Sequence, residues 1–351
     1  MIKGRGAQKM NPHKFSEFTE EIRSDFLEYM HREQEDIAIK TVIIPTFPKT
    51  IVNKVNSPDV HMNYSINPYQ GCEHGCIYCF ARNSHEYWGY NAGLDFESKI
   101  LVKQNAPELL QKKLSSPNWK ACPIGMSGNT DCYQPIEKDL KITRKLLEIF
   151  LKYRHPVGVI TKNALILRDL DLLKELASYN LVSVYLSITT LNEETRRILE
   201  PRTTTITKRL YTLQKLREHG IPVSVMVAPI IPGINSHEIL AVAKKASGLG
   251  ALSLGFTVVR LNGAIGGIFK DWLSEQFPDK KEKILHLIEQ CHGGKLNNSE
   301  FGTRKSGSGP IAAQIHQQIA IAKRKYFSNK KNFSLNCSLH EKFKSDQLQF
   351  F

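Results

Sequence analysis

Short apolar, β-branched runs alternate with amphipathic segments along this chain, from about residue 60 to residue 260. Each run is followed by a polar loop and then by apolar residues at helical spacing, which is typical of repeated strand-helix units. The last two runs are almost wholly apolar, as strands covered on both faces are. The predicted strands are residues 63–69, 122–127, 157–161, 182–188, 223–228 and 252–259.

The segments between these runs place their apolar residues along one helical stripe, with lysine and arginine on the other positions. The predicted helices of this region are residues 139–154, 169–179, 207–220 and 236–250. Their predicted N-caps are Thr207 and Ser236, and their predicted C-terminal stops are Gly220 and Gly248 or Gly250.

Outside this region, one helix is predicted in residues 14–33, another ending at Gly293, and a third beginning at about Pro310. The predicted organisation is a partly ordered N-terminal extension (1–55), a core (56–265) and a helical C-terminal region with a basic tail (266–351). Six strand-helix units are too few for an eight-stranded barrel. The predicted fold class is therefore α/β, a partial (β/α)6 TIM-like barrel whose chemistry lies at the C-terminal ends of the strands.

The 351 residues carry a net charge of +14, which favours a polyanion such as nucleic acid as a partner. A chain of this length buries a core without the help of metals or disulfides, so a bound metal is expected to be functional. No apolar run reaches the roughly 18 residues of a membrane span, and the N-terminus has no apolar stretch typical of a secretory signal. With seven cysteines, an odd number, we expect a cytoplasmic protein with reduced thiols and no membrane partner.

One stretch, "NPYQGCEHGCIYCFARNSHEYWG" (residues 67–89), carries candidate metal ligands. Cys72, Cys76 and Cys79 form a CxxxCxxC motif directly after the first predicted strand of the core. Three thiolates bind three irons of a [4Fe-4S] cube and leave the fourth iron open. The alternative is a Cys3His zinc site with His85 or His74. Because structural zinc sites usually take ligands from two separated segments, a single loop favours the cluster.

With Tyr78 inside it, and at the end of the first strand of a (β/α)6 array, this motif resembles the signature of the radical S-adenosylmethionine (SAM) superfamily. The resemblance implies two cofactors, a [4Fe-4S] cluster and SAM, with the amine and carboxylate of SAM on the fourth iron. It also implies that the cluster reduces SAM, and that the resulting 5'-deoxyadenosyl radical abstracts a hydrogen atom from a substrate. An electron donor such as flavodoxin or ferredoxin is an implied partner.

Further motifs resemble the spore photoproduct lyase-like branch of that superfamily. The stretches "SGNTDCYQPIE" and "LNEETRRILEPRTTT" are similar to one bacterial subfamily of the branch. The matching positions lie at or just past the ends of the predicted strands: Thr130 and Asp131, Thr161 and Lys162, Leu186 to Ile188, Glu200 with Pro201 and Arg209, and Val227 to Ile230.

The resemblance implies that several of these residues bind SAM. Lys162 is expected to pair with the methionine carboxylate, and Ser187 to hydrogen-bond the carboxylate or the ribose. Tyr78, Ala228 and Pro229 are expected beside the adenine. Taken singly, such residues also fit solvated strand ends, caps or turns, but as a set on one rim they favour a ligand site.

Four more residues are expected at the same site. Gly128 lets the backbone approach the amino end of SAM, and Thr130 and Asp131 follow it in the same loop. Arg202 is a candidate contact for an anionic group of the cofactor or substrate. Its alternative role is a salt bridge with Glu200 that braces a loop.

This sequence differs from the spore photoproduct lyase pattern at the residue that donates the hydrogen atom. Spore photoproduct lyases return a hydrogen atom to the product radical from a cysteine, and Gly128 stands at that position here. Cys132 and Tyr133, a few residues on, are the candidate catalytic residues. The alternative for Cys132 is a buried core cysteine.

Other candidate ligands and aromatics leave two further alternatives open. Cys291, His292 and Cys337 are candidates for a second metal, although they lack CxxC spacing. The aromatics Tyr87 and Trp88 are expected either to cover the cluster or to stack on a substrate base.

The function predicted from the sequence is that of a radical SAM enzyme acting on an unidentified substrate, with DNA or RNA as the first candidate. Lyase-like repair or modification of nucleic acid is the reaction class that the resemblance implies. The alternative is a non-catalytic iron-sulfur or zinc protein that binds nucleic acid.

Overall fold

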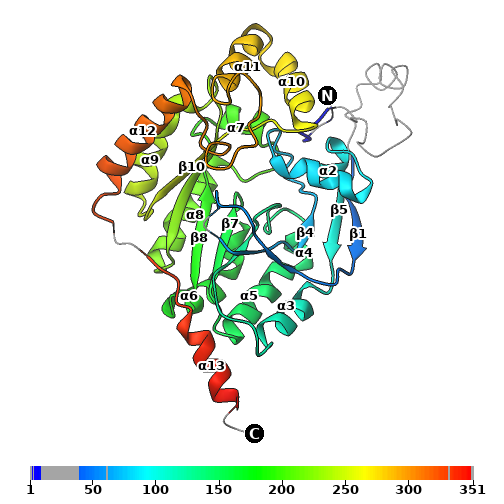
Figure 1. Ribbon diagram of the computed structural model, residues 1–351, viewed down its shortest axis with the longest axis vertical. Coiled ribbons are helices and arrows are strands. Elements are labelled where there is room, and N and C mark those ends of the chain that lie inside the picture. The colour runs from blue at the N-terminus through cyan, green and yellow to red at the C-terminus, as the bar shows by residue number, and fades with distance from the viewer. Residues whose placement is uncertain (1, 3, 9–38, 61, 331–332, 349–351) are drawn as a thin grey trace.

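A computed structural model describes residues 2, 4–8, 39–60, 62–330 and 333–348 of the chain (Figure 1). Its main feature is a seven-stranded sheet with the strand order β10-β9-β8-β7-β6-β3-β2. All neighbours pair in parallel except β2, which is antiparallel to β3. The strands are β2 (Val52–Lys54), β3 (Tyr64–Ile66), β6 (Ile124–Met126), β7 (Val157–Thr161), β8 (Val182–Ser187), β9 (Val223–Ile230) and β10 (Leu254–Val258).

The six parallel strands follow one another across the sheet in sequence order, so each strand-helix unit lies beside the previous one. They correspond to the six predicted strands. In the described residues the sheet does not close, because its edge strands β10 and β2 are not paired with each other. The predicted fold class, a partial (β/α)6 TIM-like barrel, is confirmed.

Helices cover one face of this sheet and form the main core with it (Figure 1). On β7, Val157, Val159 and Thr161 are buried, whereas Gly158 and Ile160 are partly exposed. Successive strand residues point to opposite faces, so the sheet has one helix-covered face and one open face. The helices that contribute to this core include α3 (Ala106–Leu114), α5 (Ile142–Lys152), α6 (Leu170–Ser178), α8 (Ile206–Glu218), α9 (Ile239–Gly248) and α12 (Pro310–Tyr326).

The helix limits agree with the predictions better than the caps do. The N-cap of α8 is Thr205 rather than Thr207, because the helix begins at Ile206, two residues before the start that a Thr207 cap would give. Before α9, Asn235 rather than Ser236 precedes a 3-10 turn, Ser236–Glu238. The predicted stops at Gly220 and Gly250 are confirmed by their positive φ values of 76° and 93°.

The structure outside the main sheet was predicted only in part. A three-stranded sheet with the order β1-β5-β4 was missed; it contains β1 (Val42–Thr46), β4 (Tyr69–Gln70) and β5 (Lys99–Lys103). The helix predicted at residues 14–33 lies outside the described residues. The helix expected to end at Gly293 is two helices, α10 (Ile265–Gln276) and α11 (Lys281–Glu289), since Pro278 interrupts it. The predicted domain limits stay predictions.

The two ends of the parallel strands carry different elements. The C-terminal ends form a rim with α7 (Glu193–Leu199), α10 and α11 near it, whereas α13 (Ser338–Leu348) lies at the opposite end of the molecule (Figure 1). No helix in the described ranges is long and apolar enough to cross a membrane. The rim is the part of the fold where the predicted site residues belong.

Candidate active site

The loop after β4 brings the three motif cysteines together. Cys72 and Cys76 are buried and Cys79 is half-buried, and Cys72 interacts electrostatically with both other thiols. Gly71 and Gly75 shape the loop with positive φ values of 83° and 66°, which favour glycine. Burial raises the pKa of all three thiols. A bound metal is what would turn such thiols into thiolates.

A buried carboxylate, Glu97, stabilises this loop through hydrogen bonds with Arg82 and with the N-terminal segment. It accepts hydrogen bonds from Arg82 Nη2 at 2.5 Å and from the backbone N–H groups of Gly6 and Ala7 at 2.9 Å each. Arg82 Nε in turn donates to Cys76 O at 3.0 Å. Sequence reasoning missed these residues, because no motif connects segments so far apart in the chain.

Tyr78, the aromatic residue within the motif, is tied to a buried ion pair. Its hydroxyl donates to Glu200 Oε1, which also accepts a hydrogen bond from Thr189 Oγ1 at 2.8 Å. Arg209 Nη2 donates to Glu200 Oε2 at 2.5 Å. Burial by itself raises the pKa of Glu200, but Arg209, then Lys162 and the Tyr78 hydroxyl, lower it to about 2. Glu200 is therefore ionised at neutral pH and fixes the orientation of Tyr78.

Lys162 lies beside the loop that carries Cys72, Cys76 and Cys79, which is called the cysteine loop or cluster loop below. Its Nζ is 6.0 Å from the centre of the Tyr78 ring, and it interacts electrostatically with Cys76 and Cys79. The position of Lys162 is consistent with its predicted role as the partner of the SAM carboxylate. That role stays a prediction.

Asp131 is engaged by protein groups on both oxygens. Oδ1 accepts hydrogen bonds from Thr161 Oγ1 at 2.8 Å and from the Tyr133 backbone at 2.9 Å, and Oδ2 accepts one from the Lys162 backbone at 2.8 Å. His74 Nδ1 lies 3.4 Å from Oδ2. Burial by itself raises the pKa of Asp131, but His74 and these hydrogen bonds lower it to about 2. In this arrangement Asp131 positions Lys162 and ties β6 and β7 to the cluster loop.

The predicted salt bridge between Glu200 and Arg202 is wrong. Glu200 pairs with Arg209, and Arg202 Nη2 lies 3.4 Å from Glu73 Oε1. The Arg202 backbone also donates to His74 O at 3.2 Å. Arg202 thus braces the cluster loop through another partner, and its role as an anion contact stays a prediction.

The remaining predicted SAM contacts lie on the same rim but differ in accessibility. Thr130 is buried, and its hydroxyl donates to a backbone carbonyl of β4 at 2.6 Å. Ser187 is buried at the end of β8. Gly128, Ala228 and Pro229 are partly exposed, so their backbone and side chains are available to a ligand.

Cys132 and Tyr133, the predicted hydrogen donors, lie in the main core. Neither residue is exposed (0% each), and the Tyr133 hydroxyl donates to Asp169 Oδ2 at 3.1 Å. Both side chains are closed off from a ligand in this conformation, so the geometry lends the catalytic assignment no support and it stays a prediction. Tyr185, in contrast, is 36% exposed on the open face of β8.

The three cysteines suit a cluster better than a single metal ion. Within the described ranges, no group of three His, Cys, Asp or Glu side chains is arranged to hold one metal ion. A zinc ion needs all its ligands within about 2.3 Å of one point, whereas a [4Fe-4S] cube takes each thiolate on a different iron. Three gathered thiols, two buried and one half-buried, fit the cube, and the zinc alternative finds no support.

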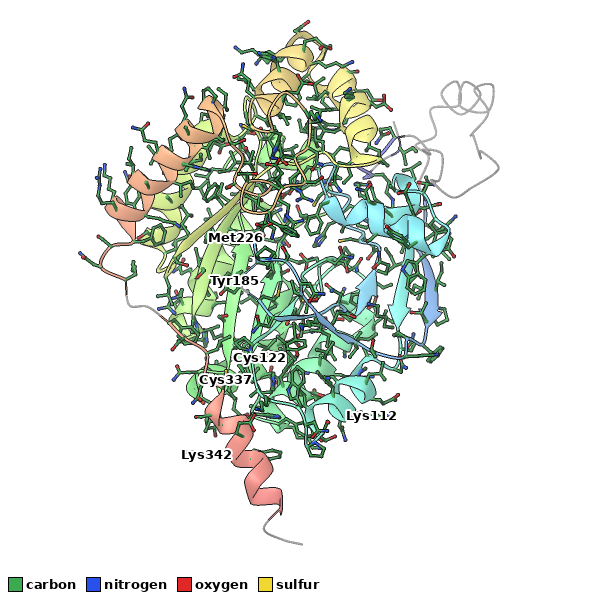
Figure 2. All side chains as sticks on the ribbon, viewed as in Figure 1. Lys112, Cys122, Tyr185, Met226, Cys337 and Lys342 are labelled. Atoms are coloured by element: carbon green, nitrogen blue, oxygen red, sulfur yellow. The ribbon has the colours of Figure 1, made fainter. Side chains whose placement is uncertain are left out.

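Of the other histidine and cysteine candidates, His85 packs against the cysteine loop, since a Cβ atom added at Gly71 would lie 3.1 Å from its Cε1. Burial lowers the pKa of His85 to about 4, so its imidazole is neutral. His292 Nε2 lies 2.7 Å from Val259 O. Cys337 lies beside Cys122 in the lower half of the molecule (Figure 2). The structure therefore does not support a second metal site built from Cys291, His292 and Cys337.

Below the rim, the open face of the sheet is lined mainly by small side chains. The strand register aligns Ser65, Gly125, Gly158 and Ser183 in one row across four strands. Tyr185 lies opposite Ser224 in a second row, and Ser187 lies opposite Met226 nearer the rim. Figure 2 shows Met226 above Tyr185 on this face. In the first row Ser65 and Gly158 are partly exposed, whereas Gly125 and Ser183 are buried.

Three aromatic side chains project from the segment that follows the cysteine loop. Phe80, Tyr87 and Trp88 belong to the 3-10 segment Phe80–Trp88 and are 54%, 77% and 45% exposed. Such exposure does not agree with a role for Tyr87 and Trp88 in covering the cluster. It agrees with the alternative, in which they offer flat faces to a ligand.

Comparisons with known proteins agree with this geometry. The model of the radical SAM superfamily matches residues 66–246. An uncharacterised protein of Mycobacterium tuberculosis is 33% identical over 248 residues, covering 69% of this chain and 72% of that protein. An uncharacterised protein of Methanocaldococcus jannaschii is 32% identical over 246 residues, covering 70% and 87%. A radical SAM Nα-GlyT isomerase of Pseudomonas phage M6 is 28% identical over 173 residues, covering 49% and 34%.

Among solved structures, the fold is similar to that of spore photoproduct lyase. The lyase complexed with dinucleoside spore photoproduct has a TM-score of 0.60 and 16% identity, and the match covers 82% of this chain and 80% of the lyase. A lyase variant with bound AdoMet and the same ligand has a TM-score of 0.62 and 14% identity, covering 89% and 94%. The predicted cofactors, a [4Fe-4S] cluster and SAM, are those of the matched family. The chain belongs to the radical SAM superfamily and has the fold of its spore photoproduct lyase-like branch.

Proposed function

We propose that this protein is a radical SAM enzyme that holds its [4Fe-4S] cluster on Cys72, Cys76 and Cys79 and acts on nucleic acid. When bound, the cluster and SAM supply a 5'-deoxyadenosyl radical that abstracts a hydrogen atom from the substrate. The observation that carries the proposal is the gathering of three cysteine thiols, two buried and one half-buried, beside the Lys162 cation and the Tyr78 ring, at the rim of a parallel sheet.

The surrounding residues have distinct roles in this proposal. Lys162 neutralises the carboxylate of SAM, and Asp131 holds the Lys162 backbone in place. Glu200 and Arg209 keep the Tyr78 ring at the angle that it needs to lie beside the adenine. Because these partners are fixed before the ligand binds, little ordering remains to be done on binding.

Charge and aromatic exposure support nucleic acid as the substrate. The net charge of +14 favours a polyanion, and Phe80, Tyr87 and Trp88 offer exposed rings next to the cluster loop. The structurally similar lyase binds a dinucleoside photoproduct. Lyase-like repair or modification of DNA or RNA is the proposed reaction class. Flavodoxin or ferredoxin is the proposed electron donor, and the cytoplasm the proposed compartment.

Anaerobic reconstitution tests the cluster assignment. Wild-type protein is expected to bind about four irons per chain and to form 5'-deoxyadenosine from SAM and dithionite. Cys76→Ala is expected to abolish 5'-deoxyadenosine formation while the chain stays folded, because the main core does not include this loop. Cys122→Ala, which removes a half-buried thiol elsewhere, is the matched control and should keep the activity. Activity in the Cys76 variant would refute the proposal.

A further inference from the structure

A hairpin between β2 and β3 reaches across the open face of the sheet. Its residue Met62 packs onto the open face of the sheet at Gly125, where an added Cβ atom would lie 1.8 Å from Met62 Sδ. At its tip, Asp59 accepts hydrogen bonds from Arg304 Nε and from the backbone of Gly302. Arg304 Nη2 also donates to Ser57 Oγ at 2.5 Å. The tip is therefore fastened to the loop between α11 and α12.

The same loop is attached to the rim beside β10. Val258, the last residue of β10, donates a backbone hydrogen bond to Lys305 O at 2.8 Å. Val259 donates to Ile230 O at 2.9 Å, so Arg260 follows directly beside the end of β9. This is the strand end that carries Ala228 and Pro229, two of the predicted SAM contacts. The loop thus meets the candidate active site at the open edge of the sheet.

Three cations surround one carboxylate where the hairpin tip, the loop between α11 and α12 and the end of β10 meet. This place is called the junction below. Arg260, Arg304 and Lys305 interact electrostatically with one another, and Asp59 is the acid that acts on all three. All three cations are partly buried. Burial and then Arg304 lower the pKa of both Arg260 and Lys305. One carboxylate against three cations leaves a surplus of two positive charges.

Arg260 and Lys305 lack an anion of their own among the described residues. In the part of the chain that the structure describes, neither side chain forms a hydrogen bond or ion pair with another residue, and Asp59 is already bonded to Arg304. Half-buried cations without partners are costly for a folded protein, and an oxyanion that pairs with them offsets that cost. The Asp59 carboxylate shows that the junction accepts an oxyanion.

We propose that Arg260, Arg304 and Lys305 form a binding site for a phosphate group of the substrate, beside the hairpin tip at Asp59. The proposal deepens the proposed function and rests on it, because the phosphate would anchor a molecule whose reacting part lies at the cluster. The phosphate belongs either to the backbone of a nucleic acid or to a small phosphorylated molecule. Both share the chemistry that arginine and lysine recognise.

Fluorescence anisotropy with a labelled single-stranded oligonucleotide, over a salt series, tests the site on the full-length protein. Arg260→Gln/Lys305→Gln is expected to bind about tenfold more weakly at low salt, and to reduce the slope of log K against log salt by about 1 to 2. Asp59→Asn is expected to bind more tightly than wild type, because it removes the competing carboxylate. Glu218→Gln, which removes one negative charge from an exposed pair elsewhere, should give a smaller gain.

The matched control removes two positive charges, as Arg260→Gln/Lys305→Gln does, but far from the proposed site. Lys112→Gln/Lys342→Gln changes two lysines at the lower end of the molecule (Figure 2) and should bind as wild type does. Equal weakening in the control and in Arg260→Gln/Lys305→Gln would overturn the site, since only net charge would then matter. Thermal unfolding of each variant confirms that it is folded before binding is measured.

Inorganic tripolyphosphate distinguishes the two sources of the phosphate. If wild type binds both probes and the double variant loses both, the site takes the backbone of a nucleic acid. If wild type binds tripolyphosphate alone, and the double variant loses it, the site takes a small phosphorylated molecule. If wild type binds neither, the proposal is wrong. SAM cleavage is measured separately, so a protein that binds phosphate without forming 5'-deoxyadenosine would refute the proposed function and leave this site standing.

Discussion

Glu200 shows how much one buried residue decides at this site. It is fully buried, and it pairs with Arg209 while it accepts hydrogen bonds from the Tyr78 and Thr189 hydroxyls. The cost of burying the charge is offset only because every oxygen has a donor. Losing the charge therefore affects both the stability of the chain and the orientation of the Tyr78 ring.

Glu200→Gln is expected to lower the free energy of unfolding by about 3–5 kcal/mol at neutral pH, since it leaves Arg209 buried without its counter-charge. Glu218→Gln, which breaks the exposed Lys215–Glu218 pair at 2.8 Å, should cost less than about 1 kcal/mol. Chemical denaturation measures both, and equal losses would contradict the argument from burial.

The stability that the Glu200 charge contributes is expected to decrease as the pH falls. The pKa of Glu200 lies near 2, below its ordinary value of 4.5, so its ionisation stabilises the folded chain above pH 4.5. That stabilisation is lost as the pH falls from 4.5 towards 2. The difference in stability between wild type and Glu200→Gln should therefore shrink over this range. A difference that stays constant would show that the charge is not responsible.

At the scale of elements, the N-terminal segment 4–8 acts as a clamp on the cysteine loop. The backbone of Gly6 and Ala7 binds Glu97, and Glu97 holds Arg82, which binds Cys76 O. Gly6 touches the loop so closely that a Cβ atom there would lie 2.0 Å from Gly75 O. The loop that carries the cluster ligands is thus shaped by a distant part of the chain.

Gly6→Ala is expected to displace this clamp and to reduce the iron content after reconstitution, together with the rate of 5'-deoxyadenosine formation. Gly248→Ala is the matched control, because a Cβ atom at that position in α9 meets no atom within 4 Å. Iron analysis and the electron paramagnetic resonance spectrum of the reduced protein provide the measurement. Normal iron content in the Gly6 variant would show that the clamp is dispensable.

Over the whole molecule, the two ends of the sheet are expected to serve different needs. The rim holds the cysteine loop, Lys162 and the ion pair of Glu200, whereas the opposite end is packed by α13. There, His340 is buried and its Nδ1 lies 2.7 Å from Tyr153 O. Partial barrels of parallel strands commonly separate chemistry and stability in this way.

His340→Ala is expected to lower the free energy of unfolding by about 1–3 kcal/mol, because it leaves a buried carbonyl without a donor. The rate of 5'-deoxyadenosine formation should stay at the wild-type value, since the change lies far from the rim. Lys162→Ala should do the reverse, with a large loss of activity and little loss of stability. Denaturation curves and activity assays on both variants compare the two ends; a loss of activity in His340→Ala would contradict the separation.

The sequence was sufficient for the parts of this protein that depend on local pattern. Apolar runs at regular spacing predicted all six parallel strands and the fold class. The CxxxCxxC spacing predicted the family, because neighbouring ligands on one loop need no tertiary information. Local rules failed at the caps, where Thr205 rather than Thr207 precedes a helix, and at Pro278, which divides one predicted helix into two.

What the sequence could not determine was which distant groups meet. The sequence placed Cys132 and Tyr133 near the substrate, but packing buries both in the core. It joined Glu200 to Arg202, whereas the fold joins Glu200 to Arg209 and Arg202 to Glu73. It showed no link between Gly6 and Glu97, or between Asp59 and Arg304. Strand pattern and ligand spacing are encoded within a few neighbouring residues, whereas ion pairs and burial depend on how the completed sheet brings separate segments together.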